Sequence, residues 1–218
     1  MPLSDLQNGS DVRGVALALP EGKPVNLTPA VCGRIAAAFV RWLAGKTGKA
    51  PSALRIGVGH DSRLTAELLK KAALSGIAAA GAAGSDCGLA STPAMFMGTV
   101  FEETGFDGSI MLTASHLPKE RNGMKFFTPD GGLDKGDITA LLPLAEEERE
   151  PAGHFGEGEK TPLMECYTAH LREKIMEGVQ KGETPLAGLH IVVDAGNGAG
   201  GFFASRVLEP LGKPFSGA

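Results

Sequence analysis

The residues with the clearest chemical potential lie in one short stretch, in which a hydroxyl is followed by an imidazole, an amide and an amine. Residues 111–133 read MLTASHLPKERNGMKFFTPDGGL. Ser115 and His116 stand side by side after an apolar run, and a turn at Asn122 and then Lys125 follow. This order predicts a hydroxyl on a sharp turn at the end of a strand, with the lysine returning toward it on the next strand. A hydroxyl held in this way can carry a phosphoryl group.

Ser115 needs neighbouring cations if it carries a phosphoryl group. A phosphoserine holds about −1.5 to −2 charges at neutral pH, and phosphoryl transfer depends mainly on positioning and on neutralising that charge. Lys125, His116 and Arg13 are the candidate cations. A serine on a turn is more often only a turn former, but this grouping favours phosphoryl transfer.

The Ser115-His116 pair also raises the alternative of an acyl-transfer nucleophile with its base. Adjacent side chains rarely point at each other, and no G-x-S-x-G elbow surrounds the serine. A triad also needs a third partner, which the sequence does not single out. Acyl transfer is therefore disfavoured.

Arg13 lies in a second candidate segment, residues 9–14 (GSDVRG), ahead of the first expected helix. In the simplest interpretation this segment is a turn with an exposed salt bridge. Alternatively, the fork-shaped guanidinium of Arg13 donates to phosphate oxygens, and Gly14 allows close approach of the backbone.

Two further segments each follow an expected strand and lead into a helix. In residues 59–63 (GHDSR), Asp61 and Arg63 are expected to form a structural pair or a cap rather than to take part in chemistry. Residues 86–93 (DCGLASTP) are expected to shape the sheet edge and the start of the next helix.

Residues 194–201 (DAGNGAGG) fit the dinucleotide fingerprint G-x-G-x-x-G. Taken literally, the backbone amides would hold a pyrophosphate, as in a nucleotide-binding oxidoreductase. The acidic residue expected about 20 positions later is missing from this sequence. A tight strand-to-helix turn is the favoured interpretation.

The composition sets the broad class. The chain has 218 residues, of which 43% are hydrophobic and 21% charged, and its net charge is −4. The chain has no basic excess that would indicate nucleic-acid binding. We also find no apolar run that would indicate a membrane span and no segment that would indicate export or targeting. The three cysteines are scattered, without a C-x-x-C pair, as expected of reduced thiols in the cytoplasm.

The elements that must position these residues alternate between helix and strand. Hydrophobic spacing and cap residues predict helices over residues 28–45, 64–80, 92–100 and 134–144, and strands over residues 54–58, 82–87, 109–112 and 124–128. This alternation predicts an α/β layered domain, with ligands gathering where strand ends meet the following loops.

The sequence divides into a first domain, a linker and a second domain. The first domain covers residues 1–145, and the acidic, glycine-rich residues 146–160 are expected to form the linker or an exposed loop. Residues 161–218 form the second domain, which is expected to be truncated. They predict an amphipathic helix at 162–180, a strand at 189–193 and a helix at 198–211.

In this order, the motifs resemble those of the α-D-phosphohexomutase superfamily, the phosphoglucomutases and phosphomannomutases. The Ser115 loop resembles their active-site serine loop, and residues 11–14 resemble their D-x-R-G element. Residues 59–63 are similar to G-R-D-x-R with His60 replacing the first arginine, and residues 86–93 are similar to D-x-G-x-x-x-T-P. The resemblance implies a layered mixed sheet with helices on both faces (domain I), followed by an incomplete second α/β domain.

The resemblance also implies a function, that of an intramolecular phosphotransferase. Such an enzyme interconverts hexose 1-phosphate and hexose 6-phosphate through a phosphoserine and a bisphosphate intermediate. The resemblance implies that Ser115 is the phosphoryl carrier and that its phosphate is a ligand of Mg²⁺. Lys125 would be a general acid/base or charge stabiliser, and His116 and Arg13 supporting contacts. Arg13, Lys125 and Asn122 would bind substrate, with hexose 1,6-bisphosphate as activator.

Some family elements are missing from this sequence. The metal loop D-x-D-x-D-R does not occur in it. We therefore expect a truncated form that is inactive alone and whose partners are hexose phosphates together with the missing domains or another subunit. The alternative is a non-catalytic phosphosugar-binding or regulatory module.

Overall fold

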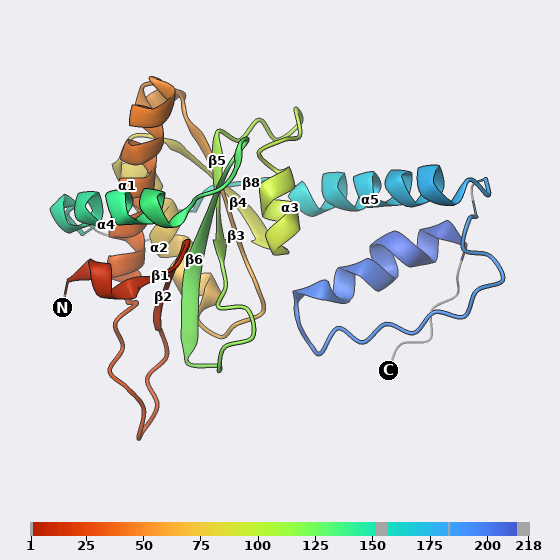
Figure 1. Cartoon of the computed structure of the whole chain (residues 1–218), viewed down its shortest axis with the longest axis horizontal. Coiled ribbons are helices and arrows are strands. Elements are labelled where there is room, and N and C mark those ends of the chain that lie inside the picture. The colour runs from red at the N-terminus through yellow and green to blue at the C-terminus, as the bar shows by residue number, and fades with distance from the viewer. Residues whose placement is uncertain (1, 151–156, 183, 213–218) are drawn as a thin grey trace. The chain divides into compact units, whose positions relative to one another are not determined.

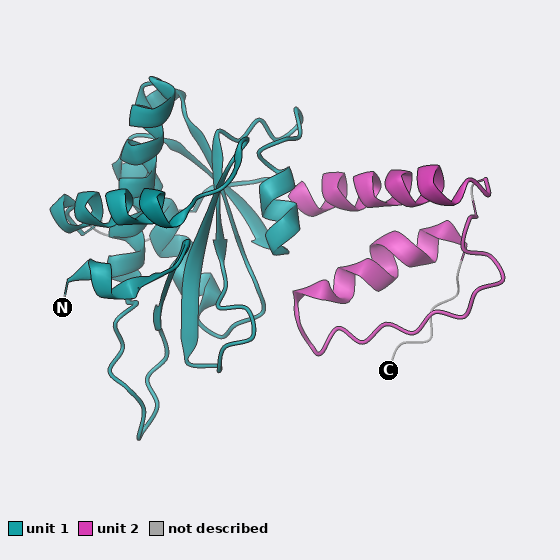
Figure 2. Ribbon diagram, in the orientation of Figure 1, with its two compact units in different colours: residues 1–161 teal, residues 162–218 magenta. Residues whose placement is uncertain are grey.

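The computed structural model describes residues 2–150, 157–182 and 184–212. The chain divides into two compact units, residues 1–161 and residues 162–218 (Figure 2).

Unit 1 is built on a mixed sheet that has eight strands within the described residues. The strands are β1 (Gln7–Asn8), β2 (Asp11–Val15), β3 (Arg55–His60), β4 (Ala83–Leu89), β5 (Gly108–Leu112), β6 (Arg121–Thr128), β7 (Gly131–Gly132) and β8 (Glu159–Lys160). Their order is β1-β2-β6-β5-β3-β4-β8, and β7 pairs with β6. The pairs β5–β3, β3–β4 and β4–β8 are parallel, whereas β1–β2, β2–β6, β6–β5 and β6–β7 are antiparallel.

Helices cover both faces of this sheet, which confirms the predicted fold class (Figure 1). The helices of unit 1 are α1 (Pro29–Thr47), α2 (Ala66–Ala79), α3 (Thr92–Met97) and α4 (Lys135–Glu147). The main core lies beneath α1, where the rings of Phe39 and Phe126 are 5.0 Å apart. A Cβ at Gly108 would meet Phe39, whereas the next side chain, Ser109, donates to the Met95 carbonyl of α3 at 2.7 Å. Side chains alternate across a strand, so α1 and α3 lie on opposite faces.

Cap residues account for the start of α1, but its predicted end is wrong. The Thr28 hydroxyl accepts a hydrogen bond from the Val31 amide at 3.2 Å, with Pro29 at the first helical position. The helix continues past Gly45 to Thr47. Gly48 ends it, because this glycine takes the left-handed conformation that such a cap needs, with φ 71°.

The helices α3 and α4 also differ from their expected bounds. The cap of α3 is Ser91 rather than Thr92, and the helix ends at Met97 instead of residue 100. Asp134 starts α4 through a capping box with Asp137.

The predicted linker, residues 146–160, contains parts of both neighbouring elements. Its first two residues extend α4, and its last two form β8, which pairs with Ser85 and Asp86 of β4. The edge of β4 supplies hydrogen-bonding partners for these last two residues. The acidic, glycine-rich sequence alone gives no sign of this pairing. Residues 151–156 of this prediction lie outside the described residues.

Unit 2 contains the helix α5 (Leu163–Val179) and an irregular helical segment. The predicted strand at 189–193 is wrong, because within the described residues of unit 2 no other strand offers a ladder of hydrogen bonds. The predicted helix at 198–211 is a 3-10 turn (Ala199–Gly201), a π-helical stretch (Phe203–Leu208) and a further 3-10 turn (Glu209–Leu211). Leu186, Leu208 and Leu211 form a small core there. No helix of the described residues is long and apolar enough to cross a membrane.

Candidate active site

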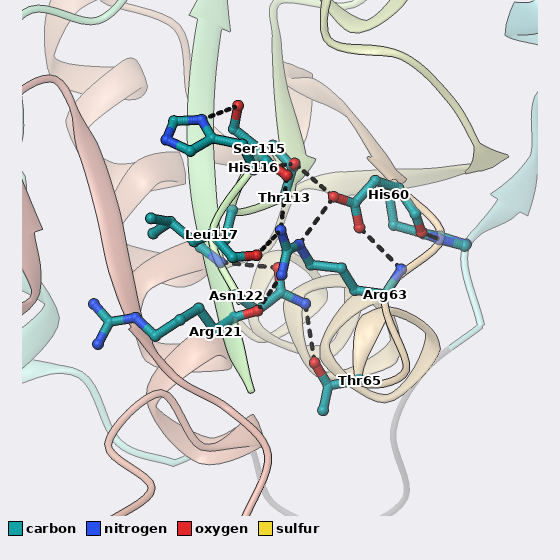
Figure 3. Close-up of polar contacts among 12 residues, drawn as sticks. His60, Arg63, Thr65, Thr113, Ser115, His116, Leu117, Arg121 and Asn122 are labelled. Atoms are coloured by element: carbon teal, nitrogen blue, oxygen red, sulfur yellow. Dashed lines mark hydrogen bonds and ion pairs between the residues drawn. The ribbon is translucent and has the colours of Figure 1, made fainter. Parts of the chain in front are cut away.

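The Ser115 loop leaves the carboxyl end of β5 and returns as β6, as the sequence predicts. Ser115 is exposed and has a φ angle of 56°, in the left-handed region that non-glycine residues seldom occupy. Its Oγ lies 3.3 Å from Nδ1 of His116, which is also exposed (Figure 3). The turn therefore presents the hydroxyl to solvent with an imidazole in contact.

A threonine and an aspartate hold the start of this turn. The Thr113 hydroxyl accepts a hydrogen bond from the Ser115 amide at 2.9 Å and donates to Oδ2 of Asp61 at 2.6 Å. Asp61 also accepts from the backbone amide and Nε of Arg63, at 3.1 and 3.2 Å. The pair that the sequence suggested between Asp61 and Arg63 is thus present, and it is joined to the serine turn.

The Arg63 guanidinium binds the backbone of the whole loop (Figure 3). Its Nη1 donates to the carbonyls of Pro118 and Arg121, both at 2.9 Å, and its Nη2 donates to those of Ser115 and Leu117, both at 2.8 Å. Sequence reasoning missed this role, because the carbonyls lie 52 to 58 residues away and carry no signature of residue type.

Arg13 and Lys125 meet at a shared carboxylate, Asp11. Asp11 accepts from Nη2 of Arg13 at 2.8 Å and from Nζ of Lys125 at 2.7 and 2.8 Å. Nη1 of Arg13 also donates to the Ala114 carbonyl at 3.0 Å, which brings this cluster to the serine turn. Two cations face one anion, so the cluster keeps one positive charge.

The sequence interpretation gave Asp11 no role in the site, although a signal for one existed. Residues i and i+2 of a strand share a face, and Asp11 and Arg13 have this spacing on β2. The register of β2 with β6, which pairs Val12 with Met124, then sets Asp11 opposite Lys125.

Gly123 allows β2, β6 and the start of the serine turn to come close together. A Cβ there would overlap the Val12 carbonyl oxygen and lie 2.9 Å from the Thr113 carbonyl oxygen and 3.2 Å from Cγ of Arg13. Any side chain at this position would displace either the strand or the arginine.

Asn122 lies in the interior, in contrast to the expectation that it binds substrate. Its side chain is completely buried. It donates to the Thr65 hydroxyl at 3.0 Å and accepts from the Gly123 amide at 2.8 Å. Its amide is therefore engaged in fixing the turn and has no exposed surface to offer a ligand.

A chain of titratable side chains continues behind Asp61. The ring of the buried His60 contacts the Asp61 carbonyl at 2.7 Å and the Glu67 carboxylate at 3.0 Å. A hydrogen bond from Lys70 lowers the pKa of Glu67, against the opposing effect of its partial burial. Burial alone would lower the pKa of Lys70, but hydrogen bonds to Asp86 and Glu67 outweigh it and raise that pKa.

The site's own residues do not form a metal-binding cluster. Across the part of the chain that the structure describes, no three His, Cys, Asp or Glu side chains gather in a way that could hold a metal ion. The two carboxylates nearest the serine turn, Asp11 and Asp61, are both engaged by arginine or lysine donors. The described residues therefore do not by themselves fit the expected Mg²⁺.

The glycine-rich turn at 194–201 lacks the packing that a dinucleotide site requires. In that motif the third glycine lets helix and strand pack closely. A Cβ at the corresponding Gly201 would meet no atom within 4 Å, and the residues before the turn form no strand. The turn is closed locally, by the Gly196 amide on Asp194 and the Gly198 amide on the Ala195 carbonyl, both at 2.8 Å.

Comparison with known proteins identifies the family to which this chain belongs. Residues 5–150 match the family model described as phosphoglucomutase/phosphomannomutase, alpha/beta/alpha domain I. A phosphoglucosamine mutase from Kineococcus radiotolerans is 34% identical over 94% of this chain, and a phosphoglucomutase/phosphomannomutase from Thermococcus kodakarensis is 31% identical over 85% of it. The chain therefore belongs to the phosphoglucomutase/phosphomannomutase family, the phosphohexomutases.

A solved structure supports the same fold. A phosphoglucomutase/phosphomannomutase family protein from Burkholderia thailandensis superposes on the whole chain with a TM-score of 0.74 at 24% identity. The chain covers 44% of that protein, and 44% and 40% of the Kineococcus and Thermococcus relatives. It thus spans less than half the length of these proteins.

Proposed function

We propose that this chain carries the phosphoserine half of an intramolecular phosphotransferase that interconverts hexose 1-phosphate and hexose 6-phosphate. The observation that carries the proposal is the exposed Ser115 hydroxyl, which lies on a strained turn beside the Arg13 and Lys125 cluster. Strained backbone persists where the surrounding structure over-determines it, as at sites of chemistry.

The chain's residues have distinct parts in the proposed transfer. When Ser115 takes a phosphoryl group from a hexose bisphosphate, a bond forms between Oγ and phosphorus as the bond to the sugar oxygen breaks. The Oγ proton passes to Nδ1 of His116, which is 3.3 Å away. The ammonium of Lys125 protonates the departing sugar oxygen, and Arg13 neutralises charge on the transferring group. By the reverse sequence, the phosphoserine donates this phosphoryl group to the free hydroxyl of a further hexose monophosphate, which regenerates a bisphosphate. Ser115 then takes the phosphoryl group from the other end of that bisphosphate and releases the isomeric monophosphate.

The complete reaction needs more than the residues described above. We propose that hexose phosphates are the substrates, that hexose 1,6-bisphosphate is the activator, and that further domains or another subunit complete the site. Mg²⁺ is proposed only from the family resemblance. A cytoplasmic location is proposed because all three cysteines are free thiols.

A phosphosugar-binding or regulatory module is the second candidate. Two observations together favour it: cations lie beside the serine turn, and the described residues hold no metal-binding cluster. Such a module would bind phosphosugars without becoming phosphorylated.

Covalent labelling tests the two functions. The chain is incubated with glucose 1,6-bisphosphate and Mg²⁺, and the gain of one phosphoryl group is followed by intact-mass spectrometry. Ser115→Ala is compared with Ser52→Ala, which removes an exposed serine from the short 3-10 helix Pro51–Ala53. Loss of labelling only in Ser115→Ala supports the phosphotransferase, whereas binding without labelling of the unmodified chain supports the module. Neither binding nor labelling would contradict both functions.

A further inference from the structure

Ser115 adopts a backbone conformation that its residue type does not favour. A serine at φ 56° is strained, and without contacts to hold it the residue would relax toward negative φ. Such relaxation would swing the Cα–Cβ bond and move Oγ away from its present position. Something in the fold must therefore oppose it.

Both peptide groups of Ser115 are held by one connected set of side chains. Its N–H donates to the Thr113 hydroxyl, and its C=O accepts from Nη2 of Arg63. Thr113 and Arg63 in turn meet at a single oxygen, Oδ2 of Asp61, at 2.6 and 3.2 Å. The conformation of the serine is thus fixed from its two sides by groups that converge on one carboxylate.

The Arg63 guanidinium is fully used in this arrangement. A guanidinium has five N–H donors, and all five are engaged: one by Asp61 and four by carbonyls of the loop. The side chain is only 11% exposed. Arg63 therefore has no donor left for a substrate, and any effect on chemistry must pass through the loop.

We propose that Arg63, oriented by Asp61, is the positioning residue that sets the backbone of Ser115 for phosphoryl transfer. This inference rests on the proposed function. Lysine cannot replace arginine here, because an ammonium has three donors on one nitrogen and cannot span four carbonyls. Arg63 acts on the rate of transfer and leaves sugar binding unchanged.

The first experiment measures labelling of Ser115 by glucose 1,6-bisphosphate in the full chain. In Arg63→Ala we expect the maximal labelling rate to fall about a hundredfold, with the half-saturating bisphosphate concentration unchanged. Arg63→Lys should resemble Arg63→Ala. Millimolar ethylguanidinium should restore part of the rate in Arg63→Ala but not in Arg63→Lys, where the cavity is filled.

A matched arginine separates positioning from general stability. Arg34 also donates to backbone carbonyls, those of Ala145 and Glu146 at the end of α4, but it contacts no part of the serine loop. Arg34→Ala should label at the rate of the unmodified chain, even if its melting temperature falls as far as that of Arg63→Ala. A normal labelling rate in Arg63→Ala would overturn the proposal.

If the unmodified chain is not labelled, the proposed function fails, and a second measurement then tests the positioning role of Arg63 by itself. Amide hydrogen exchange of residues 113–122 reports the loop without any phosphoryl transfer. Exchange that is faster in Arg63→Ala than in Arg34→Ala would support the positioning of the loop by Arg63. Equal exchange in both variants would overturn it.

Discussion

Among the described residues, three non-glycine residues take the left-handed region: Gln180, which caps the end of α5, and Ser115 and Asn197, whose turns are held in different ways. Ser115 has φ 56° and Asn197 has φ 55°. The serine turn is fixed by Arg13 from β2 and by Arg63 from the connection between β3 and α2. Both residues are more than 50 positions away from the turn in sequence. The asparagine turn is closed, within the part of unit 2 that the structure describes, by hydrogen bonds between groups two and three residues apart.

The residue types explain this difference. Asparagine is enriched in left-handed conformations, whereas serine has no such preference. Asn197 therefore needs only local hydrogen bonds. Ser115 keeps its conformation through long-range contacts, and such contacts around an exposed hydroxyl distinguish a built site from an ordinary turn.

The largest difference between the two regions is expected from adding one methyl group to a glycine. Gly123→Ala should lower the free energy of unfolding of unit 1 by about 3 kcal/mol, because the added Cβ meets backbone atoms of neighbouring segments. Gly201→Ala, whose Cβ meets no atom within 4 Å, should leave unit 2 unchanged. Urea unfolding followed by Trp42 fluorescence for unit 1 and Tyr167 fluorescence for unit 2 measures both. A neutral Gly123→Ala would show that the strands can separate without cost.

Removing a carboxylate should give the next largest contrast. Asp11→Ala leaves Arg13 and Lys125 facing each other unpaired and should cost about 2 kcal/mol of stability. Asp194→Ala loses one hydrogen bond from the Gly196 amide and should cost about 0.5 kcal/mol. The same urea titrations compare the two variants. Equal losses of stability would refute the idea that the Asp11 cluster is more tightly coupled than the turn at Asp194.

Relief of backbone strain should act in the opposite direction. Ser115→Gly should raise the free energy of unfolding by about 1 kcal/mol, because glycine adopts positive φ without steric cost. Asn197→Gly should change it much less, because asparagine already tolerates this conformation. A destabilised Ser115→Gly would mean that the serine conformation is not strained in the folded chain.

The smallest expected effect concerns acid stability. The pKa of Glu67 is lowered from its ordinary value of 4.5, first through the hydrogen bond from Lys70. Its contribution to stability is therefore present above pH 4.5 and is lost as pH falls through the lowered pKa. Glu67→Gln should remove this acid-dependent part, about 0.5 kcal/mol or less because the Glu67 side chain is largely exposed.

Glu177 is the matched control for this acid effect. Its pKa is also lowered, by Lys174, but both side chains lie on the surface of α5. The effect of Glu177→Gln should vanish in high salt, whereas that of Glu67→Gln should persist. Thermal melts between pH 3 and pH 7 at two salt concentrations test this, and identical salt dependence in the two variants would contradict it.

The sequence predicted those parts of the fold and site that depend on local patterns. The period of apolar residues placed α1 and β3, and the spacing of Ser115, His116 and Lys125 indicated the loop between two strands. Local patterns also suggested a strand at 189–193. They could not tell that the described part of unit 2 offers that segment no partner.

The remaining features of the site arise from contacts between distant segments. The four carbonyls that Arg63 binds have no side-chain identity, so nothing in the sequence marks them. Asn122 has the same residue type whether it faces a ligand or, as here, the interior beside Thr65. Only the register of β2 against β6 decides which of these polar residues share the site.

That register also has a consequence for synthesis of the chain. Asp11 and Lys125 are 114 residues apart, and β6 lies between β2 and β5 in the sheet. A chain still emerging from the ribosome therefore exposes the serine hydroxyl before the strand that completes its surroundings has left the exit tunnel. The lysine becomes a neighbour of Asp11 only when β6 has inserted between two strands that were made earlier, so the hydroxyl gains its charged surroundings late in the synthesis of unit 1.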